Sequence, residues 1–444
     1  MRPTLIDLND QELRITRGVD ELARSPGYAT LVNHQVEVGE AGHANAWRVP
    51  RQSHHRFWQA LDTAPLTQLG KRVRHAGDLA YLHLTQLRER AGRPSSAIFI
   101  VPGAYQRAQL SLLLGIAQAA GLKVDALVDS AVAVGAILPP GHYTHVETSL
   151  HHSTITRLEV DEQRATRTHI EVVMEAGFTH FEQRIIECIV AAFLKSCRFD
   201  ALHDAATEQL LHTHLAQWLS LLAEQSEIAL TIDYRGARHE TRLRREVLVS
   251  ALAPLRRMLA ERAGTGNILL DYRLGALPGL TTEWAVQVLP SHATLTGCTY
   301  SPDLATLDST GVSLRTTLAV VPTAVQFIPT PAGRITASPA RSAPLSAAQV
   351  ATHVVFEHVA YPLSLRALYL TARGTLAERT SDDVLGSVVL ESGVSRVERT
   401  QGNTLLLNGQ ALTGNAPLAP GDQLSVIGTP TVFTLIRVLR DDAL

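Results

Sequence analysis

The stretch SSAIFIVPGAYQRAQLSLLLGIAQAAGLKVDALVDSAVAVG, residues 95–135, decides the predicted fold. Its run AIFIV (97–101) is short, apolar and rich in branched and aromatic residues, as in a strand buried on both faces. Residues 104–120 predict a helix that ends at Gly121, and residues 123–136 predict a second strand followed by a small-residue helix. A strand, a helix and a strand in this order form a crossover unit, so we expect an α/β core.

Alternating and helical patterns continue on both sides of this stretch. The runs TLIDL and ELRIT, near the start, and the run at 142–160 each predict a hairpin. Helical periods fall at 56–69, 77–92, 179–194, 207–227 and 244–262. Residues 267–271 predict another strand. The whole of residues 1–320 therefore reads as one α/β region.

The chain changes character after residue 320. Residues 321–347 are rich in Pro, Ser, Ala and Gly and have scarcely any charge, which predicts a flexible linker over 321–350. Short strand-like runs with turn signals then recur at regular spacing between residues 352 and 438. We expect a small all-β sandwich over residues 351–444.

Composition argues against several classes of function. Lys and Arg number 40 against 42 Asp and Glu, a net charge of -2, so the broad basic field that nucleic acid requires is not expected. Three distant cysteines and scattered histidines suggest neither disulfides nor a metal site. No window approaches ~18 uncharged apolar residues, and the first residues lack the apolar core of a signal peptide. We expect a cytoplasmic protein without a membrane partner.

The opening stretch resembles the ATPase domain of DnaK-type heat-shock chaperones, in the actin-like superfamily. Val101-Pro102 ends the strand, Ala108-Gln109 lies in the helix and Gly121-Leu122 closes it, as in that family. LIDL near the start, VGEAG (38–42) and FEQRI (181–185) add matches in the family's order over roughly residues 1–320. The resemblance implies a two-lobed actin-like α/β fold. Fold alone does not imply chemistry, so the catalytic positions are compared singly.

The first phosphate loop of that family departs from the pattern in this chain. The strand aspartate is kept as Asp7, but Asn9, Asp10, Gln11 and Glu12 stand where the family uses glycine and threonine. Ionised carboxylates at Asp10 and Glu12 would repel a phosphate. We expect this loop to be a poor phosphate site.

The second phosphate loop has lost its glycines as well. Glu147 takes the position of the family's aspartate, and Ser149, Leu150 and His151 stand where a run of glycines normally follows. Side chains occupy the space that a phosphate needs, and glycine alone tolerates positive φ without strain. Asp7 and Glu147 are therefore predicted to be vestiges of a catalytic site.

Other nucleotide-binding positions are changed too. The resemblance places Trp58 near the catalytic lysine, and Asp129-Ser130-Ala131 at the Asn-Glu-Pro connection. Tyr272 and Arg273 replace the paired glycines of the adenosine loop and would fill the adenosine slot. We expect no Gly-x-Gly or Gly-Gly anywhere in the first 320 residues, and so no other loop that could take over. An inactive pseudo-ATPase with no cofactor and no metal is predicted.

The C-terminal region resembles a forkhead-associated domain, whose members read phosphothreonine. Ser395-Arg396 matches the family's Ser-Arg pair, Asn408-Gly409 its Asn-Gly, and PLAPGDQLSVIG (417–428) its Gly-Asp segment. The Gly-Arg position falls at Glu378-Arg379, and Glu398 replaces the histidine. Arg379, Ser395, Arg396 and Asn408 are the candidate peptide-binding residues. They serve either a peptide or phosphopeptide site or only turns and loop packing.

These patterns together predict a catalytically inactive chaperone-ATPase-like scaffold or regulatory adaptor that binds a protein partner. Two alternatives stay open. One is an active, ATP-dependent chaperone-like ATPase that uses ATP and magnesium through Asp7 and Glu147. The other is a phosphothreonine-peptide reader that acts through the C-terminal domain.

Overall fold

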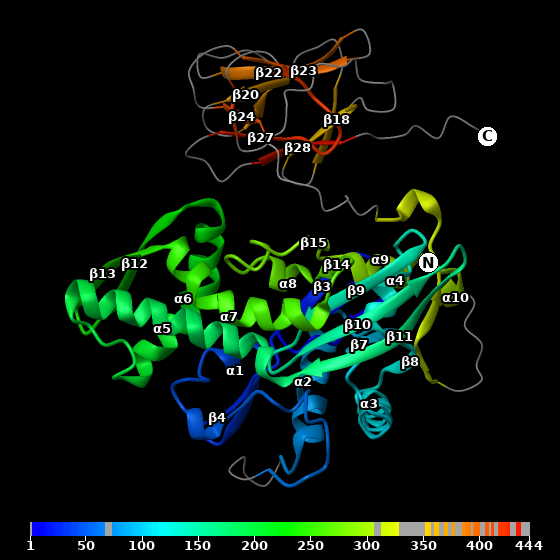
Figure 1. Ribbon diagram of the computed structural model, residues 1–444, viewed down its shortest axis with the longest axis vertical. Helices are drawn as coiled ribbons and strands as arrows, with labels where there is room; N and C mark the ends of the chain where they lie inside the picture. Colours follow the sequence, from blue (N-terminus) through cyan, green and yellow to red (C-terminus); the bar gives the residue numbers. More distant parts are fainter. Residues whose placement is uncertain are drawn as a thin grey trace. The chain divides into compact units, whose positions relative to one another are not determined.

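The computed structural model divides the chain into two compact units, Met1–Arg334 and Ile335–Leu444. It describes residues 2–66, 73–305 and 312–327 of the first unit. In the second unit it describes residues 351–356, 359–363, 368–371, 375–377, 384–391, 394–399, 405–407, 410–412, 416–426 and 432–436. Helices and sheets are mixed throughout the first unit, so the expected α/β class is confirmed (Figure 1).

The first sheet has the strand order β16-β8-β7-β1-β2-β3. Its strands are β1 (Thr4–Asp7), β2 (Leu13–Arg17), β3 (Asp20–Ser25), β7 (Ser96–Val101), β8 (Lys123–Asp129) and β16 (Leu314–Arg315). The first three form the predicted hairpin and its return, whereas β1, β7, β8 and β16 run parallel. Helices α2 (Ala76–Arg90) and α3 (Arg107–Ala119) provide the crossovers.

The second sheet repeats this topology, in the order β15-β14-β9-β10-β11-β17. Its strands are β9 (Gly141–Thr148), β10 (Ser153–Val160), β11 (Arg164–Val173), β14 (Asn267–Leu270), β15 (Val286–Val288) and β17 (Thr317–Ala319). Here β9, β10 and β11 form the antiparallel meander, and β14 and β15 run parallel to β9. The two halves of the first unit are thus built on one plan.

Strand β7 explains why the opening stretch is apolar without alternation. Ala97, Phe99 and Val101 pack with α2 and α3 in one core. Ile98 and Ile100 point the other way, into a core shared with the second sheet. Side chains alternate faces along a strand, so a strand between two cores must be apolar at every position.

The shared core lies between the two sheets and contains two short helices, α4 (Ser130–Gly135) and α9 (Ala293–Tyr300). Helix α4 follows a strand of the first sheet but packs on β10 and β11, and α9 follows the second sheet but packs on β1 and β7. Each half therefore places a helix against the other. Gly297 permits this, because a Cβ there would lie 1.9 Å from the Ala133 carbonyl oxygen.

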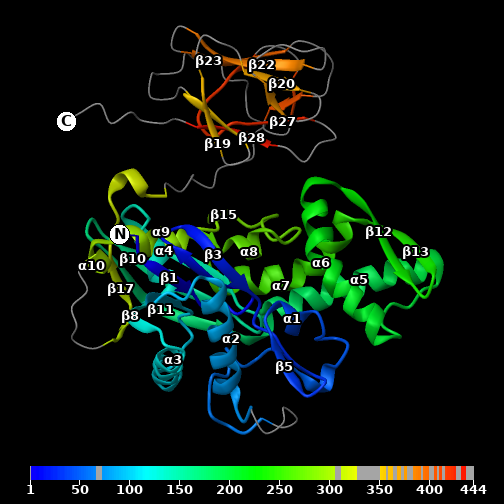
Figure 2. The ribbon, with the colours of Figure 1, turned by 180° about the vertical axis from the view of Figure 1, so that it is seen from behind.

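The remaining elements extend the two halves. One end holds α5 (Phe178–Cys197), α6 (Ala205–Glu224), α7 (Arg245–Ala263) and the hairpin β12 (Glu227–Tyr234) with β13 (Ala237–Arg244) (Figures 1 and 2). Before β7 come β4 (Ala29–Val32), β5 (Gln35–Val38), α1 (Glu40–His43), η1 (Pro50–Gln52) and β6 (Ser53–His54). Short elements complete the unit: η2 (Met174–Ala176), α8 (Tyr272–Gly275), α10 (Pro302–Ala305) and η3 (Thr323–Val325). Over the described residues, no helix combines the length and apolar character needed to cross a bilayer.

The helix predicted at 56–69 is not formed between residues 56 and 66. Side chains of the α3 region take the carbonyl oxygens that a helix would use, since Tyr105 Oη donates to Trp58 O (2.9 Å) and Gln109 Nε2 to Gln59 O (2.7 Å). Asp62 then accepts from Ala64 N (3.1 Å), a turn that precedes Pro65. Tertiary contacts override the local pattern here.

The start of the expected linker is bonded to the first unit. Val321 N donates to Ala136 O (2.9 Å), and Phe327 N donates to Ile137 O (2.6 Å). Val321 is also buried in the core shared by the sheets. The rest of the linker, residues 328–350, lies outside the described residues.

The described strands of the second unit form two antiparallel sheets, in the orders β19-β18-β28-β27-β24-β25 and β21-β20-β22-β23-β26. Their bounds are β18 (His353–Phe356), β19 (Val359–Pro362), β20 (Leu368–Thr371), β21 (Leu376–Ala377), β22 (Val384–Glu391), β23 (Val394–Arg399), β24 (Leu405–Leu407), β25 (Gln410–Ala411), β26 (Ala416–Pro417), β27 (Gln423–Val426) and β28 (Val432–Ile436). One apolar core joins them, with Leu370 and Val388 from one sheet and Leu424 and Phe433 from the other.

Alanine substitutions at two glycines, one at the contact and one as a control, test the close approach of α4 and α9. The Gly297→Ala substitution forces a methyl group against backbone atoms of α4, so we expect a loss of about 2–3 kcal/mol in the free energy of unfolding. At Gly115, inside α3, a Cβ would meet nothing within 4 Å, and Gly115→Ala is expected to stabilise by up to ~1 kcal/mol. Urea unfolding followed by tryptophan fluorescence measures both, because all four tryptophans lie in the first unit. Equal effects would contradict the packing described.

Candidate functional site

Four carboxylates lie at the carboxyl ends of parallel strands, where ligands of open α/β sheets usually bind. Asp7 ends β1 and Asp129 ends β8 in the first sheet. Glu147 lies at the end of β9, and Asp271 directly follows β14, in the second sheet. All four are buried. The two carboxylates predicted as vestigial, Asp7 and Glu147, therefore belong to one central cluster.

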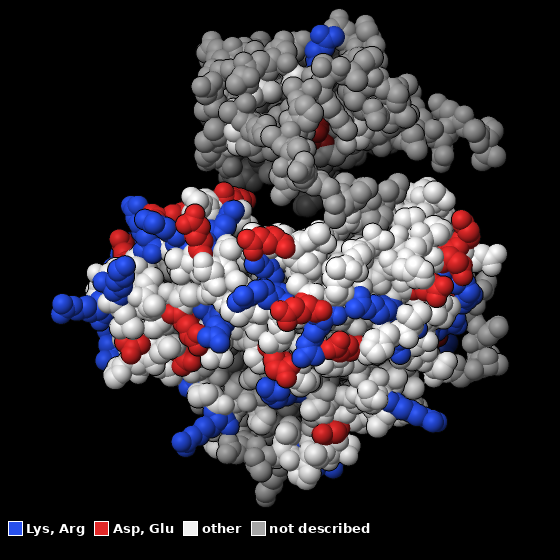
Figure 3. Space-filling model, viewed as in Figure 1, with Lys and Arg blue, Asp and Glu red and all other residues white. Residues whose placement is uncertain are grey.

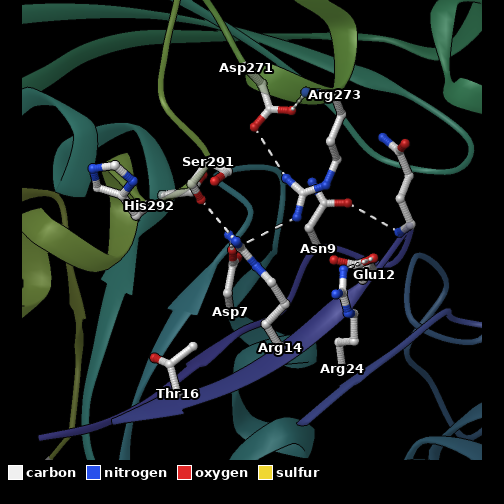
Figure 4. Close-up of polar contacts among 12 residues, drawn as sticks. Asp7, Asn9, Glu12, Arg14, Thr16, Arg24, Asp271, Arg273, Ser291 and His292 are labelled. Atoms are coloured by element: carbon white, nitrogen blue, oxygen red, sulfur yellow. Dashed lines mark hydrogen bonds and ion pairs between the residues drawn. The ribbon is translucent and has the colours of Figure 1, made fainter. Parts of the chain in front are cut away.

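Arginines neutralise this cluster (Figure 4). Arg14 Nη2 lies 2.6 Å from Asp7 Oδ2, and its Nη1 donates to Ser291 O (2.8 Å). Arg273 Nη1 lies 3.2 Å from Asp271 Oδ2, and its Nη2 lies 3.9 Å from Asp7 Oδ2. The Tyr272 ring sits beneath both guanidinium groups, 5.4 Å from that of Arg14 and 4.5 Å from that of Arg273. Positive charge from the chain itself occupies the centre.

The two loops that resemble phosphate loops are hydrogen-bonded directly to each other. Asn9 Nδ2 and Gln11 Nε2 both donate to Thr148 O, at 2.9 and 2.7 Å. Leu150 N donates to Asp10 Oδ1 at 2.7 Å. Asn9 Nδ2 also lies 3.3 Å from Glu147 Oε1. Side chain and backbone groups that could contact a phosphate are thus used to hold the loops together.

Burial alters the protonation of the carboxyl groups in this cluster. Burial first, and then the neighbouring carboxylate Asp271, raises the pKa of Glu147 to about 8. Ser130 Oγ lies within hydrogen-bonding distance of its Oε2 (2.5 Å). Burial also raises the pKa of Asp10 to about 6, against the hydrogen bond from Leu150 N. Glu147 is therefore mainly protonated at neutral pH, which makes it a poor metal ligand.

The remaining residues of the second loop have packing roles. Leu150 is buried against Tyr28 and Ala46. Ser149 N donates to His152 O (2.8 Å), and Ser149 O accepts from Phe178 N (2.9 Å). Gly177, at the start of α5, closes this turn, since a Cβ there would lie 2.2 Å from the carbonyl carbon of His151. The loop is filled by its own chain.

Two further positions have structural partners. Asp129 caps α4 by accepting from Ala131 N and Val132 N, and it forms an ion pair with Arg167 of β11. Trp58, at the position of the family's lysine, is buried and donates from Nε1 to His83 Nδ1 (3.0 Å). Both side chains are therefore engaged in contacts within the first unit.

One sequence expectation is wrong, because Gly264-Thr265-Gly266 is a Gly-x-Gly within the first 320 residues. Both glycines have positive φ, 72° and 117°, and turn the chain from α7 into β14. This turn lies at the amino end of β14, whereas Asp271 follows its carboxyl end. It therefore lies at the opposite end of the second sheet from the loop at 148–150.

Of the candidate peptide-binding residues in the second unit, Arg379 and Asn408 lie outside the described residues. Ser395 is buried on β23, and its Oγ donates to Leu418 O (2.8 Å). Arg396 is partly exposed on the same strand, which pairs with β22 and β26. The geometry of Ser395 favours loop packing over a phosphate contact.

Sequence reasoning missed the partner of Asp7. Arg14 lies opposite Asp7 in the register of β1 and β2. The predicted hairpin places charged residues on one face there, since Leu13 and Ile15 point into the core. The alternation of apolar and polar residues in ELRIT (12–16) is the sequence signal that could have identified the pair of Asp7 and Arg14. Arg167 gave no comparable signal, because it lies 38 residues from its partner.

Comparisons with known proteins give no identification: no protein-family model matches the chain, and no curated protein is found to be similar. Within the described residues, no group of three or more His, Cys, Asp or Glu side chains is placed to hold a metal ion. The function must therefore be argued from the site itself.

Removal of Arg14 tests the central ion pair. Arg14→Ala leaves Asp7 buried and without its closest counter-charge, so we expect a loss of about 3–5 kcal/mol in unfolding free energy. Arg24 provides the matched control, because its side chain is 59% exposed and pairs with Glu21 at the surface. Arg24→Ala should cost less than ~1 kcal/mol. Urea unfolding that shows similar losses for both would contradict a dependence on the buried pair.

The raised pKa of Glu147 predicts a defined pH dependence. The folded state binds a proton at Glu147 up to about pH 8, whereas the unfolded state releases it near pH 4.5, so stability falls as pH rises between these values. Glu147→Gln removes this term. Relative to wild type, the variant should gain several kcal/mol between pH 5 and pH 8.5, at roughly 1.4 kcal/mol per pKa unit.

Urea unfolding at several pH values measures this difference, with Glu159→Gln as control. Glu159 is exposed on β10, so its substitution should leave the pH profile unchanged. A Glu147→Gln profile parallel to that of wild type would show that the buried carboxyl does not titrate as described.

Proposed function

We propose that the chain is a catalytically silent, two-lobed protein of the actin-like fold that serves as a nucleotide-independent scaffold for a protein partner. The observation that carries this proposal is the direct bonding of the loop at 9–12 to the loop at 148–150. A phosphate between these loops would have to replace those hydrogen bonds. Each replaced bond leaves a buried donor or acceptor to be satisfied again.

The repeated sheet topology supports the two-lobed fold. Both sheets begin with an antiparallel meander of three strands and continue with parallel strands beside the first. Helix α4 follows the first sheet but packs on the second, and α9 follows the second sheet but packs on the first. This internal repeat agrees with the resemblance to actin-like ATPases, and it places the carboxyl ends of β1 and β9 together, as a cleft between two lobes would.

Electrostatics support the loss of nucleotide chemistry. Magnesium binding needs ionised carboxylates, yet Asp7 and Asp271 are paired with arginines and Glu147 is mainly protonated at neutral pH. An arginine could in principle hold a phosphate, but these guanidinium groups already face carboxylates. The alternative of an active ATPase would require these pairs to separate.

The surface supports a protein partner more than a polyanion. Over the described residues in Figure 3, basic and acidic side chains are interspersed instead of gathering by sign. A mixed surface lacks the single-sign field that draws nucleic acid. The alternative of a phosphothreonine-peptide reader receives no support from Ser395, because its hydroxyl donates a hydrogen bond to Leu418 O within the second unit.

Nucleotide titration of the full chain tests the proposal. Isothermal titration with magnesium-ATP at neutral pH should give no binding heat, and a phosphate-release assay should give no turnover. A partner captured from extract should then be retained equally with added magnesium-ATP and after ATP removal by apyrase.

An Asp7→Asn variant separates the outcomes of this titration. It keeps the size of the side chain while removing the carboxylate that an active site would use. Binding and hydrolysis by wild type that disappear in Asp7→Asn, with unchanged circular dichroism, would overturn the proposal and support the ATPase. Binding that persists in Asp7→Asn would place the nucleotide outside this cleft.

A further inference from the structure

A separate cavity of about 440 Å³ opens beside the closed cluster, between the segment from β4 to β6 and the helices α5 and α6. Figures 1 and 2 both show α1 of that segment next to α5 and α6. Its volume falls in the range of about 300–1,000 Å³ that is usual for small-molecule sites. None of the four central carboxylates lines it, so it is a site of its own.

Aromatic rings form one wall of this cavity. Trp47 stacks on His212 of α6, with ring centroids 3.5 Å apart and planes 11° from parallel. Tyr28 lies against Trp47, with a centroid distance of 5.6 Å. Gln209 of α6 fixes the tryptophan from behind, because it accepts from Trp47 N (3.1 Å) and donates to His43 O (3.0 Å). The wall is therefore formed before any ligand arrives.

The acidic side chains of the lining are all glutamates. Glu182 and Glu187 of α5 and Glu208 of α6 line the cavity, whereas no Lys or Arg is found among the described residues that line it. Glu182 is buried and accepts from His212 Nδ1 at 2.8 Å. Glu187 is paired with Arg184 at the surface (3.3 Å). Burial lowers the pKa of His55, also in the lining, to about 4, so this histidine is uncharged at neutral pH.

We propose that this cavity binds an organic cation of the alkylammonium class, held between the Trp47 and Tyr28 rings and the carboxylates of Glu182 and Glu208. Aromatic faces attract cations through the negative potential of their π-systems, and a carboxylate supplies the counter-charge. An anion would meet these glutamates with no Lys or Arg among the described lining residues to attract it. The cation is either a free amine or the lysine side chain of a protein partner, and only the second source rests on the proposed scaffold function.

Titration calorimetry on the full chain tests this site with cadaverine at neutral pH and low salt. Saturable binding is expected, accompanied by a change in tryptophan fluorescence that is lost in Trp47→Phe. The uncharged isostere 1,5-pentanediol should not bind. Failure of cadaverine to bind, or equal binding of the diol, would overturn the proposal.

Two variants on one helix provide the matched comparison. Glu208→Gln should weaken cadaverine at least threefold, since it removes a lining charge without burying new groups. Glu224→Gln, at the exposed far end of α6, removes the same charge and should change nothing. Equal affinities of the two variants would show that the cation binds through the general field of the protein and would refute the site.

A second probe separates the sources of the cation. Tighter binding of Nα-acetyl-lysinamide than of n-butylamine, which carries the same single charge, would identify a partner's lysine, and the reverse would identify a free amine. Both results support the cavity. Magnesium-ATP titrated into the same sample reports on the closed cluster alone, so failure of the scaffold proposal and failure of the cation site give different results.

Discussion

The first unit depends on the pairing of buried carboxylates with arginines between its two sheets. A charge taken out of water costs several kcal/mol unless a counter-charge and hydrogen bonds compensate it. Each arginine of the cluster is supplied by a different segment: Arg14 by β2, Arg167 by β11 and Arg273 by α8. Arg167 reaches from the second sheet to Asp129 of the first, and Arg273 lies between Asp271 and Asp7. These ion pairs therefore hold the two sheets together.

This arrangement has a consequence for motion. To admit a ligand at the strand ends, the chain would have to break the contacts between the two loops and move Arg273 away from Asp7. With about 1 kcal/mol for each neutral hydrogen bond, and more for the charged contacts, such an opening costs several kcal/mol. A state that lies this far above the ground state is rarely populated. The hydrogen bonds and ion pairs therefore keep the space between the strand ends closed.

The sequence predicted the elements whose patterns arise from burial. β7 was evident because both of its faces are in a core, and α5 because its stripe of apolar residues faces one. The helix expected at 56–69 is not formed over the described residues 56–66, because Tyr105 and Gln109 donate to backbone carbonyl groups there, and no local pattern encodes such distant donors. The repeat of the sheet topology was not predicted from the residues either, because it lies in the order of the strands and not in a repeated sequence pattern.

The site was predicted in the same uneven way. Asp7 and Glu147, named from the resemblance alone, both lie at strand ends in one cluster, but the pairing of Asp7 with Arg14 required the hairpin register. Arg273 was expected to fill a slot for adenosine, and its partner turned out to be Asp271, two residues away. The cavity between the β4–β6 segment and helices α5 and α6, called here the lateral cavity, could not be predicted at all. Its lining residues, near 28–55 and 179–212, meet only in the folded chain.

The closed cluster and the lateral cavity follow opposite electrostatic rules within one unit. In the cluster, each strand-end carboxylate has an arginine or is protonated, so no charge is left for a ligand. In the cavity, the buried Glu182 accepts a hydrogen bond from His212, and Glu208 is a partly buried residue of the lining. This contrast in charge compensation favours the cavity, over the cluster at the strand ends, as the site of the proposed cation.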